Sequence, residues 1–219
     1  MILRGLDLIK KINLNKNGKL EFGCGQKKNS PNNTSIDIKD FSSVDIVGDI
    51  FDVLKLIEDN TIDYIESFHF FEHIKDLNKL LNECSRVLKN DKKMRIVVPH
   101  FSNPYYYSDP THENFFGLYT FSYFSKKDYF TRKVPKYYDG MFNIFKIKLI
   151  FKTNKPKYII YFFKKILQQI FNLNNFSKEF YEENLCYVFP CYEIDIILRN
   201  DKIFKMVAEE GFEPPTSRI

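Results

Sequence analysis

A tight glycine turn at the end of a short strand constrains this chain more than any other feature of its sequence. The turn is Gly23-Cys24-Gly25, and it follows the apolar run from Lys19 to Phe22. Two glycines in three residues let backbone N–H groups approach a ligand closely. An acidic residue, Asp37, ends the next predicted strand, where its carboxylate can accept hydrogen bonds from both hydroxyls of a ribose. Together these features predict a ligand-binding edge of an α/β sheet.

The spacing between this turn and Asp37 narrows the ligand further. Dinucleotide-binding sheets carry the acid about 20 residues after the glycines and add a third glycine. Here Asp37 follows Gly25 by only about a dozen residues, no third glycine is present, and a polar stretch, 27–34, replaces the usual helix. A pyrophosphate needs a well-formed helix N-terminus, for which this connection has almost no room. The spacing favours a ligand that has a ribose and no phosphates.

Short apolar runs separated by polar turns predict the rest of the sheet. Between two of them, apolar residues from Ile74 to Leu88 recur at three- and four-residue steps, which predicts a helix. Alternating strands and helices imply βαβ units with right-handed crossovers. Short, partly continuous runs are typical of parallel strands covered on both faces. The predicted strands are 19–22, 35–38, 44–47, 62–67 and 93–98.

The second half of the chain changes character. Residues 145–151 and 192–198 alternate apolar side chains with charged ones, which predicts two half-exposed strands. We expect them to pair as a long-connected hairpin at one edge of the sheet. The connection between them, about 153–190, is too long for a turn and is predicted to be an insertion.

Residues 157–171, within this insertion, have the pattern of an amphipathic helix. Lys164, Lys165 and Gln168 lie opposite an apolar stripe. Two interpretations stay open: a basic helix that lies on an anionic membrane, and an ordinary helix packed on the domain. The formal net charge of +5 is compatible with an anionic partner but does not require one. The stripe consists of Ile159, Phe163, Ile166 and Ile170.

Five short motifs, in order and with matching spacing, extend the prediction from fold to family. They are Leu20 to Gly25, Ile36 to Ile38, Gly48 to Ile50, Phe70 to Ile74 and Arg86 to Lys89. Together they resemble the class I S-adenosylmethionine-dependent methyltransferases, and most of all the small methyltransferase type 11 kind, over residues 18–124. The resemblance implies a Rossmann-like α/β fold with a mostly parallel sheet of the seven-stranded type and an aromatic, basic insertion before the last strand. It also implies an enzyme with S-adenosylmethionine as its cofactor.

The resemblance assigns cofactor-binding roles to the ends of the first four strands. The glycine turn would line the methionine moiety, one acid would hold the ribose, and a second acid would receive the exocyclic amine of adenine. The implied residues are Glu21 as support of the loop, Phe22, Gly23, Cys24 and Gly25 at the turn, Asp37 and Ile38 at the ribose, Asp49 and Ile50 at the adenine, and Phe68 and His69 beside the sulfonium. Each acid also has an alternative interpretation that involves no ligand. Glu21 could be a solvated charge at a strand end, Asp37 a turn cap, and Asp49 a helix N-cap.

Methyl transfer to a hydroxyl or carboxyl acceptor requires the removal of one proton, which a histidine can accept near neutral pH. The loop after the fifth predicted strand contains His100 and His112, with Asp109 placed to orient an imidazole. These three are the predicted catalytic residues; the alternative is that both histidines are structural donors in a lid. His73 is expected to order the start of its helix. No metal site is predicted, because the sequence offers the two loop histidines no third ligand at a helpful spacing.

The acceptor is the least constrained part of the prediction. The loop segments Pro99 to Ser102 and Asp109 to His112 resemble those of proteins encoded near surface-glycan assembly genes, which implies a sugar, a lipid-linked sugar or another small molecule. The run from Asn103 to Tyr106 follows the wrong strand for the amino-methyltransferase motif that it resembles, and no nucleic-acid partner is expected. A non-catalytic cofactor-binding or scaffold domain is the alternative from another functional class.

The sequence predicts a single methyltransferase domain over residues 1–205. Residues 206–219 differ in composition and contain the one alanine of the chain. They resemble a reading frame that runs antisense through a transfer-RNA gene, so we expect a tail without function. No CxxC pair, signal peptide or bilayer-spanning apolar run is apparent. The expected location is the cytoplasm, with peripheral membrane contact through residues 157–171 as the second possibility.

Overall fold

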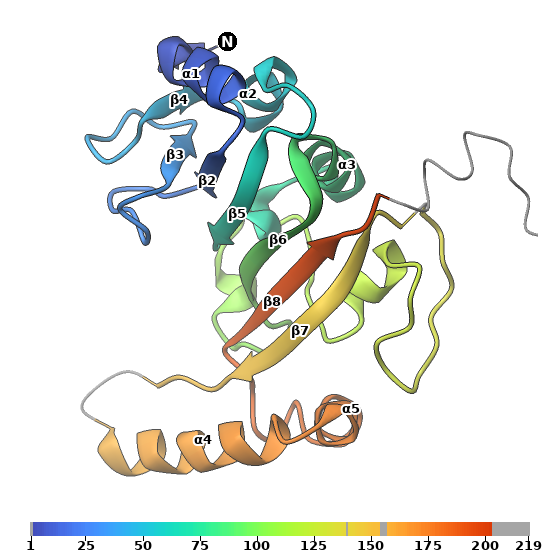
Figure 1. Cartoon of the computed structure of the whole chain (residues 1–219). Coiled ribbons are helices and arrows are strands. Elements are labelled where there is room, and N and C mark those ends of the chain that lie inside the picture. The colour runs from blue at the N-terminus through green and yellow to red at the C-terminus, as the bar shows by residue number, and fades with distance from the viewer. Residues whose placement is uncertain (1, 139, 154–156, 203–219) are drawn as a thin grey trace, which may run out of the picture.

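A computed structural model describes residues 2–138, 140–153 and 157–202 (Figure 1). In chain order, their elements are β1 (Ile2–Arg4), α1 (Leu6–Asn15), β2 (Gly18–Phe22), β3 (Thr34–Asp37), β4 (Ile46–Gly48), α2 (Ile50–Leu56), β5 (Ile62–Phe68), the 3-10 helix η1 (Phe71–His73), α3 (Leu77–Val87), β6 (Leu88–Pro99), the 3-10 helices η2 (Tyr106–Ser108) and η3 (Thr120–Phe124), β7 (Phe142–Ile150), α4 (Tyr158–Phe171), α5 (Asn175–Asn184) and β8 (Glu193–Asn200). The predicted tail, 206–219, lies outside the described residues.

The eight strands form one sheet in the order β1-β4-β3-β2-β5-β6-β8-β7 (Figure 1). The strands β4, β3, β2, β5 and β6 are parallel. β8 is antiparallel to both β6 and β7, and β1 is antiparallel to β4. Without β1, the sheet has seven strands, and their order confirms the predicted Rossmann-like arrangement. The pairing of β7 with β8 confirms the predicted hairpin. β1 is an additional edge strand.

Among the five parallel strands, the direction in which the chain adds strands reverses once. β3 and β4 lie on one side of β2, whereas β5 and β6 lie on the other, and β2 pairs directly with β5 in parallel. In open α/β sheets, ligands bind beyond the carboxyl ends of the strands at such a reversal. The loops after β2 and β5 therefore open toward the same place, which is where the glycine turn lies.

α3 begins where the sequence supplies a cap. The side chain of Asp76 accepts a hydrogen bond from the backbone N–H of Lys79 at 2.9 Å, and η1 ends just before Ile74. The helix therefore begins at Leu77, three residues later than predicted. It packs against β6 and α2, and its buried side chains include Leu77, Leu80, Leu81, Cys84 and Val87.

The N-terminal segment contains two elements that the sequence analysis did not predict. β1 extends the sheet beyond β4, and α1 follows it across Gly5. α1 buries only Ile9 and Ile12. An apolar stripe this narrow is hard to separate from the surrounding lysines and asparagines by periodicity.

One face of the sheet, over β5, β6, β8 and β7, carries no helix within the described part of the chain (Figure 1). Charged side chains occupy it instead. Arg95 on β6 donates two hydrogen bonds, 2.9 and 2.8 Å long, to the carboxylate of Asp195 on β8. The expectation that helices cover both faces of the sheet is therefore wrong for β5, β6, β8 and β7. On this face, charged side chains pair with one another and no helix of the described chain packs against them.

A register shift in β7 changes the pattern expected for that strand. Between Ile144 and Lys146 the pairing with β8 slips by one residue. Phe145, expected on the inner face with Ile147, is turned outward and exposed as a result. The ammonium of Lys93 lies 3.6 Å from the centre of its ring, so the exposed ring still has a favourable cationic neighbour.

The predicted insertion forms α4 and α5, which lie beyond the end of β7 (Figure 1). This is the edge toward which the parallel strands also run, so the insertion and the loops after β5 and β6 share one end of the molecule. No helix of the described residues is long and apolar enough to cross a membrane.

Candidate functional site

The turn after β2 needs both of its glycines. Gly23 and Gly25 have φ angles of 66° and 56°, in the left-handed region that favours glycine. A Cβ on Gly23 would lie 2.6 Å from a ring carbon of Phe70, whereas a Cβ on Gly25 would meet no atom within 4 Å. Phe22 and Cys24 are buried beside the turn. Gly23 is thus required by packing, and Gly25 borders open space in which a ligand can approach the backbone.

A buried carboxylate holds the loop that follows the turn. Glu21 accepts hydrogen bonds from the backbone N–H of Asn29 at 2.8 Å and of Ser30 at 3.1 Å, and from the side-chain amide of Asn29 at 2.9 Å. The connection from β2 to β3 has no helix, as its polar composition predicts, and these bonds fix it instead. Glu21 is fully buried, so the alternative of a solvated strand-end charge is wrong.

Asp37 joins the end of β3 to the glycine turn. Its Oδ2 accepts a hydrogen bond from the backbone N–H of Gly25 at 2.9 Å, and its Oδ1 accepts one from Lys39 at 2.9 Å. The carboxylate therefore reaches the turn, as the ribose role requires, and also caps the chain after β3. The neighbouring side chain of Ile38 is 67% exposed, which makes it an apolar surface available to a flat ring.

Asp49 is the N-cap of α2. Its Oδ1 accepts hydrogen bonds from the backbone N–H of Phe51 at 2.9 Å and of Asp52 at 3.4 Å, which fits the local alternative. The predicted contact of Ile50 with adenine is not supported, because this side chain is 6% exposed and belongs to the core. Ile38 is the better-placed apolar side chain at this edge.

The carboxyl end of β5 carries a histidine between two acids. His69 has a φ angle of 51°, a backbone state that is costly for a residue other than glycine and clusters at functional sites. Its Nε2 lies 2.9 Å from Glu193 and its Nδ1 lies 3.4 Å from Glu72. The hydrogen bonds to Glu193 and then to Glu72 raise the pKa of His69 to about 9. The imidazole is therefore protonated at neutral pH.

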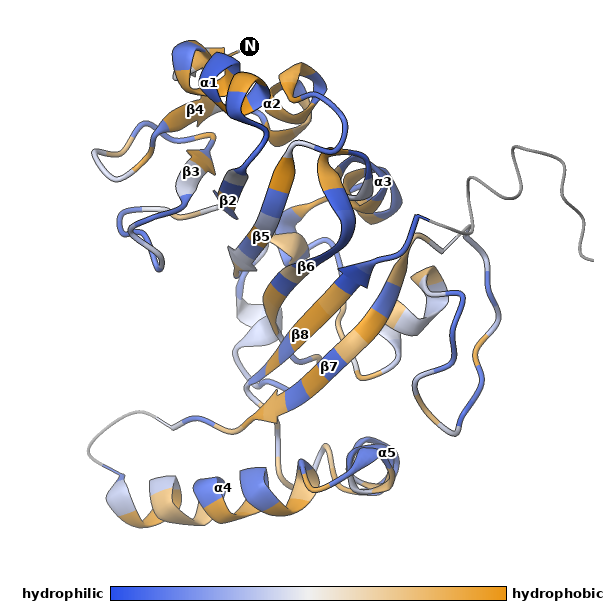
Figure 2. Ribbon diagram, in the orientation of Figure 1, coloured by the Kyte–Doolittle hydropathy of each residue, from blue (hydrophilic) through white to orange (hydrophobic). Residues whose placement is uncertain are grey.

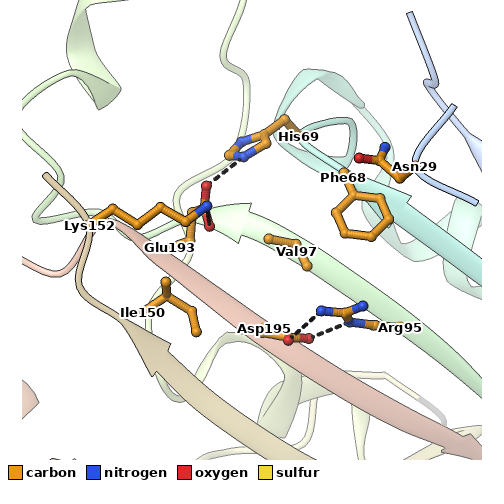
Figure 3. A pocket seen from close by; sticks show the side chains of 9 residues that line it. All are labelled: Asn29, Phe68, His69, Arg95, Val97, Ile150, Lys152, Glu193 and Asp195. Carbon is orange, nitrogen blue, oxygen red and sulfur yellow. Dashed lines mark hydrogen bonds and ion pairs between the residues drawn. The ribbon is translucent and has the colours of Figure 1, made fainter. Parts of the chain in front are cut away.

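A cavity of about 360 Å³ opens beside His69 (Figure 3). Asn29, from the loop after β2, borders it near Phe68, and Lys152 and Glu193 border its other side. Lys152 forms an ion pair with Glu193. Burial opposes ionisation of Glu193, yet the hydrogen bonds from His69 and Lys152 lower its pKa. The cavity thus joins the edge predicted to bind the cofactor to a network of paired charges.

Phe68 and His69, predicted to lie beside the sulfonium, line this cavity, whereas Glu193 and Lys152 were not predicted to belong to the site. Both lie in the second half of the chain, at the ends of the predicted hairpin. The antiparallel register that sets Glu193 opposite Pro99 brings it to the end of β6. The sequence shows a charged residue at each end of the hairpin. Only the strand order shows that this end lies beside β6, whose other neighbour is β5.

The predicted base His100 lies in a closed environment. It is fully buried, its Nδ1 lies 2.7 Å from Ser102 Oγ, and its Nε2 lies 2.9 Å from Glu182. Glu182 also accepts a hydrogen bond from the backbone N–H of Leu118 at 2.7 Å. With both ring nitrogens engaged and no access to solvent, His100 ties the loop after β6 to α5. Its prediction as a base is not supported.

His112 is partly exposed and keeps one ring nitrogen available. Its Nδ1 lies 2.8 Å from the carbonyl oxygen of Tyr106. Because a carbonyl only accepts, Nδ1 must donate, and Nε2 then carries the lone pair of the neutral ring. Asp109 Oδ2 is 3.8 Å from that Nε2. The prediction that Asp109 orients the imidazole is not supported, because the carbonyl of Tyr106 orients it instead. His112 is the remaining candidate base.

Comparisons with known proteins agree with this geometry. Residues 24–96 match the family Methyltransf_11, described as a methyltransferase domain. A SAM dependent methyltransferase from Archaeoglobus fulgidus is similar in structure, with a TM-score of 0.52 and 17% identity over 90% of this chain and 92% of that one. A chain in the complex of the Haloferax volcanii Trm112 methyltransferase activator with the putative methyltransferase has a TM-score of 0.50 and 13% identity, over 84% and 82% of the two chains. No curated protein matches the sequence.

Proposed function

Because this chain carries the class I S-adenosylmethionine-dependent methyltransferase domain, we propose that it transfers the methyl group of this cofactor to a lipid-linked sugar at a membrane surface. The domain supplies the donor edge, at the glycine turn, Asp37 and Ile38. The observation that carries the choice of acceptor is the orientation of α4, which turns its apolar side chains into solvent.

The apolar stripe of α4 points away from the rest of the molecule. Ile159 is 87% exposed and Phe162 is 68% exposed, and Phe163, Ile166 and Ile170 are also exposed. Figure 2 shows the hydrophobic colour along the side of α4 that faces away from the sheet. Exposed apolar side chains in such a row mark an interaction surface rather than ordinary solvent-facing structure.

The polar side of α4 faces the protein. Gln168 accepts a hydrogen bond from the backbone N–H of Phe151 at 3.0 Å, and Lys164 donates one to the carbonyl of Lys152 at 2.7 Å. Leu167 and Phe171 are the buried residues of the helix. A helix that packed on the domain in the ordinary way would turn its apolar stripe inward. This orientation supports the membrane interpretation over that of an ordinary packed helix.

The charge around α4 favours an anionic surface. Lys157 is the N-cap residue of α4, Lys164 and Lys165 lie on the helix, and the helix contains no aspartate or glutamate. Lysines close to an anionic bilayer contribute about 1 kcal/mol each, and an apolar stripe below them adds the burial of its side chains. A second copy of this chain on the same surface would instead bring like charges together.

Two adjoining cavities support an acceptor with a polar head and a lipid tail. A cavity of about 210 Å³ is bordered by Tyr105, Lys157 and Ile160. Lys152 borders both this cavity and the one beside His69. A sugar headgroup held near His69 would thus extend along Lys152 toward the N-terminal turn of α4, where a lipid chain meets the membrane.

Sedimentation with vesicles tests the membrane contact. The protein should bind vesicles that contain phosphatidylglycerol and remain in the supernatant with pure phosphatidylcholine. The double variant Ile159→Ser/Phe162→Ser should weaken binding about tenfold or more, because it removes apolar area that would enter the bilayer. Leu14→Ser is the matched control, since Leu14 is 83% exposed on α1 and should leave binding unchanged.

Charge reversal separates electrostatic from apolar attraction. Lys157→Glu/Lys165→Glu should weaken binding to anionic vesicles, and added salt should do the same to the wild-type protein. These lysines are preferable to Lys164, which holds the carbonyl of Lys152. Binding that is indifferent to lipid charge and to both double variants would contradict the proposal. A dimer by light scattering that Ile159→Ser/Phe162→Ser converts to a monomer would assign the stripe to a second copy.

Methyl transfer tests the acceptor itself. Incubated with methyl-labelled S-adenosylmethionine and a membrane lipid extract, the protein should move label into the organic phase. Label that appears only in water-soluble sugars or small molecules would contradict a lipid-linked acceptor. Cofactor binding without transfer to any extract would instead favour the non-catalytic alternative.

A further inference from the structure

Three potential metal ligands converge where η1 meets the loop after η2. Glu72 and His73 belong to η1, and His112 belongs to the loop. One oxygen or nitrogen of each lies within 4.8 Å of those of the other two, and the two imidazole rings are 5.0 Å apart. Glu72 and His73 are adjacent in the sequence, but His112 lies about forty positions later, so spacing alone did not reveal them as partner ligands.

Backbone hydrogen bonds hold the two segments together. The carbonyl of Glu72 accepts hydrogen bonds from the backbone N–H of Glu113 at 2.7 Å and of Asn114 at 3.2 Å. The side-chain amide of Asn114 donates to the carbonyl of Ile74. The convergence of the three side chains therefore follows from a fixed contact between the loops after β5 and β6.

Both histidines have Nδ1 engaged by the loop that contains His112. His73 Nδ1 lies 3.2 Å from the carbonyl and 2.9 Å from the hydroxyl oxygen of Thr111, and His112 Nδ1 lies 2.8 Å from the carbonyl of Tyr106. The hydroxyl of Thr111 donates to Asp109 and so can only accept from His73. Nδ1 is therefore the donor in both rings, and each neutral ring keeps its lone pair on Nε2. A histidine that binds a metal typically donates its other ring N–H to a carbonyl or carboxylate in this way.

Glu72 completes the set with a buried carboxylate. The side chain is 1% exposed, and its Oε1 lies 3.4 Å from His69 Nδ1. Its Oε2 is buried and has no hydrogen-bond partner among the described residues. A buried carboxylate oxygen without a partner is unfavourable, and a cation held with the two imidazoles would supply one.

We propose that Glu72, His73 and His112 bind a divalent transition-metal ion of the zinc type. Two imidazoles with one carboxylate form the ligand set of zinc sites that keep an open position and of some iron sites. Ca²⁺ and Mg²⁺ fit poorly, because they prefer oxygen ligands. His73 and His112 are partly exposed, so the open position is accessible. Asp109, 3.8 Å from His112 Nε2, adds negative charge there.

This proposal gives His112 Nε2 a role different from that of a free base. The lone pair that would accept a proton is occupied when a metal is bound. Metal binding also stands independently of the acceptor proposed above, because the three ligands lie on η1 and the loop and not on α4.

Titration of the chelator-stripped full chain with Co²⁺ tests the site. The wild-type protein should bind about one Co²⁺ per chain, with the visible absorption of a four- or five-coordinate site, and Zn²⁺ should displace it. Glu72→Gln, His73→Gln and His112→Gln should each abolish this absorption. Glu113→Gln is the matched control: it removes an exposed carboxylate next to His112 and should bind Co²⁺ as the wild type does.

A further variant probes how the ligands are held. Thr111→Val removes the hydroxyl beside His73 Nδ1 and should weaken Zn²⁺ binding about 10- to 100-fold, as expected when a residue that orients a ligand is lost. Circular dichroism of the metal-free variants checks that they fold, and S-adenosylmethionine binding, measured on the same samples, checks the donor edge separately. Because His73 and His112 are partly exposed, their variants keep the test valid if Glu72→Gln does not fold.

Two outcomes would overturn the metal site. The first is a wild-type chain that binds neither Co²⁺ nor Zn²⁺ at micromolar concentration. The second is binding that survives all three ligand substitutions, which would place the ion elsewhere. If S-adenosylmethionine binding and methyl transfer persist in either case, the methyltransferase proposal stands and only the metal site is lost.

Discussion

The donor edge of the sheet and the α4 end of the molecule differ in how their functional groups are set. At the donor edge, Glu21 holds the loop after β2 through Asn29 and Ser30, and Asp37 holds Gly25. Each of these hydrogen bonds spans at most about a dozen residues. At the α4 end, Lys152 and Glu193 meet His69 from distant parts of the chain. The first region is determined locally, and the second depends on the tertiary arrangement.

This difference explains why one region could be predicted from sequence and the other could not. A glycine that needs a positive φ and an acid at a strand end are local requirements, so they leave a recognisable spacing. The direction in which a helix turns its stripe is not a local property. If the distinction is real, substitutions at the donor edge should act through backbone strain and direct ligand contacts, whereas those near β8 should act through charge coupling.

The two glycines of the turn should give the largest contrast. Gly23→Ala combines left-handed strain of about 1–2 kcal/mol with overpacking against Phe70 of about 1–3 kcal/mol. Gly25→Ala should cost only the strain, about 1–2 kcal/mol, because its Cβ enters open space. Urea unfolding of the two variants measures the difference. Equal losses of unfolding free energy would mean that the ring of Phe70 moves to accommodate the new methyl group, so that packing does not require glycine at position 23.

The fold was predictable to the extent that its elements have clean periodicity. The five parallel strands, the β7–β8 hairpin and the helix before β6 follow from apolar spacing. α1 was missed because it buries two side chains, and Phe145 was misplaced because a single register shift in β7 reverses its face. The spacing of apolar residues locates a strand or the apolar stripe of a helix. It does not show where a strand has a bulge or which element a helix packs against.

Asp37 should give the next effect, on cofactor affinity. Asp37→Ala removes charge-assisted hydrogen bonds of about 1.5–3 kcal/mol, so S-adenosylmethionine should bind about 10- to 100-fold more weakly by calorimetry. Asp40→Ala is the control, because Asp40 pairs with Arg4 at the surface and touches no residue of the turn. A variant at Asp37 that binds the cofactor as tightly as wild type would remove the ribose assignment.

The candidate site was predictable only on its cofactor side. Glu21 supports the loop as predicted and Asp37 reaches the glycine turn, whereas His100 is closed in by Ser102 and Glu182. The sequence placed His100 and His112 in one loop but could not show which imidazole would be buried. It likewise could not show that Glu72 and His73 would lie beside His112, because that contact joins loops from two strands.

His69 should give the smallest effect, and one that depends on pH. Its pKa is raised from about 6.5 to about 9 by Glu193 and Glu72, so the folded protein holds this proton more tightly than the unfolded chain does. The stabilisation is therefore fully present below about pH 6.5 and is lost as the pH rises through about 9. Because His69 is half exposed, solvent screening limits its contribution to about 1 kcal/mol.

Thermal unfolding of wild type and His69→Asn at pH 6 and pH 9.5 measures this coupling. At pH 6 the variant should melt about 2–4 °C below wild type, as about 1 kcal/mol implies for a chain of this size, and the gap should close at pH 9.5. A chelator in the buffer keeps any ion at Glu72 from contributing. Glu193→Gln should also destabilise the protein more at pH 6 than at pH 9.5. The double variant should cost less than the sum of the two single variants, because both remove the ion pair between His69 and Glu193. A difference in melting temperature that stays constant with pH would mean that His69 stabilises the protein by packing and not by its charge. The α4 side of the site would then depend on packing, as the donor edge does.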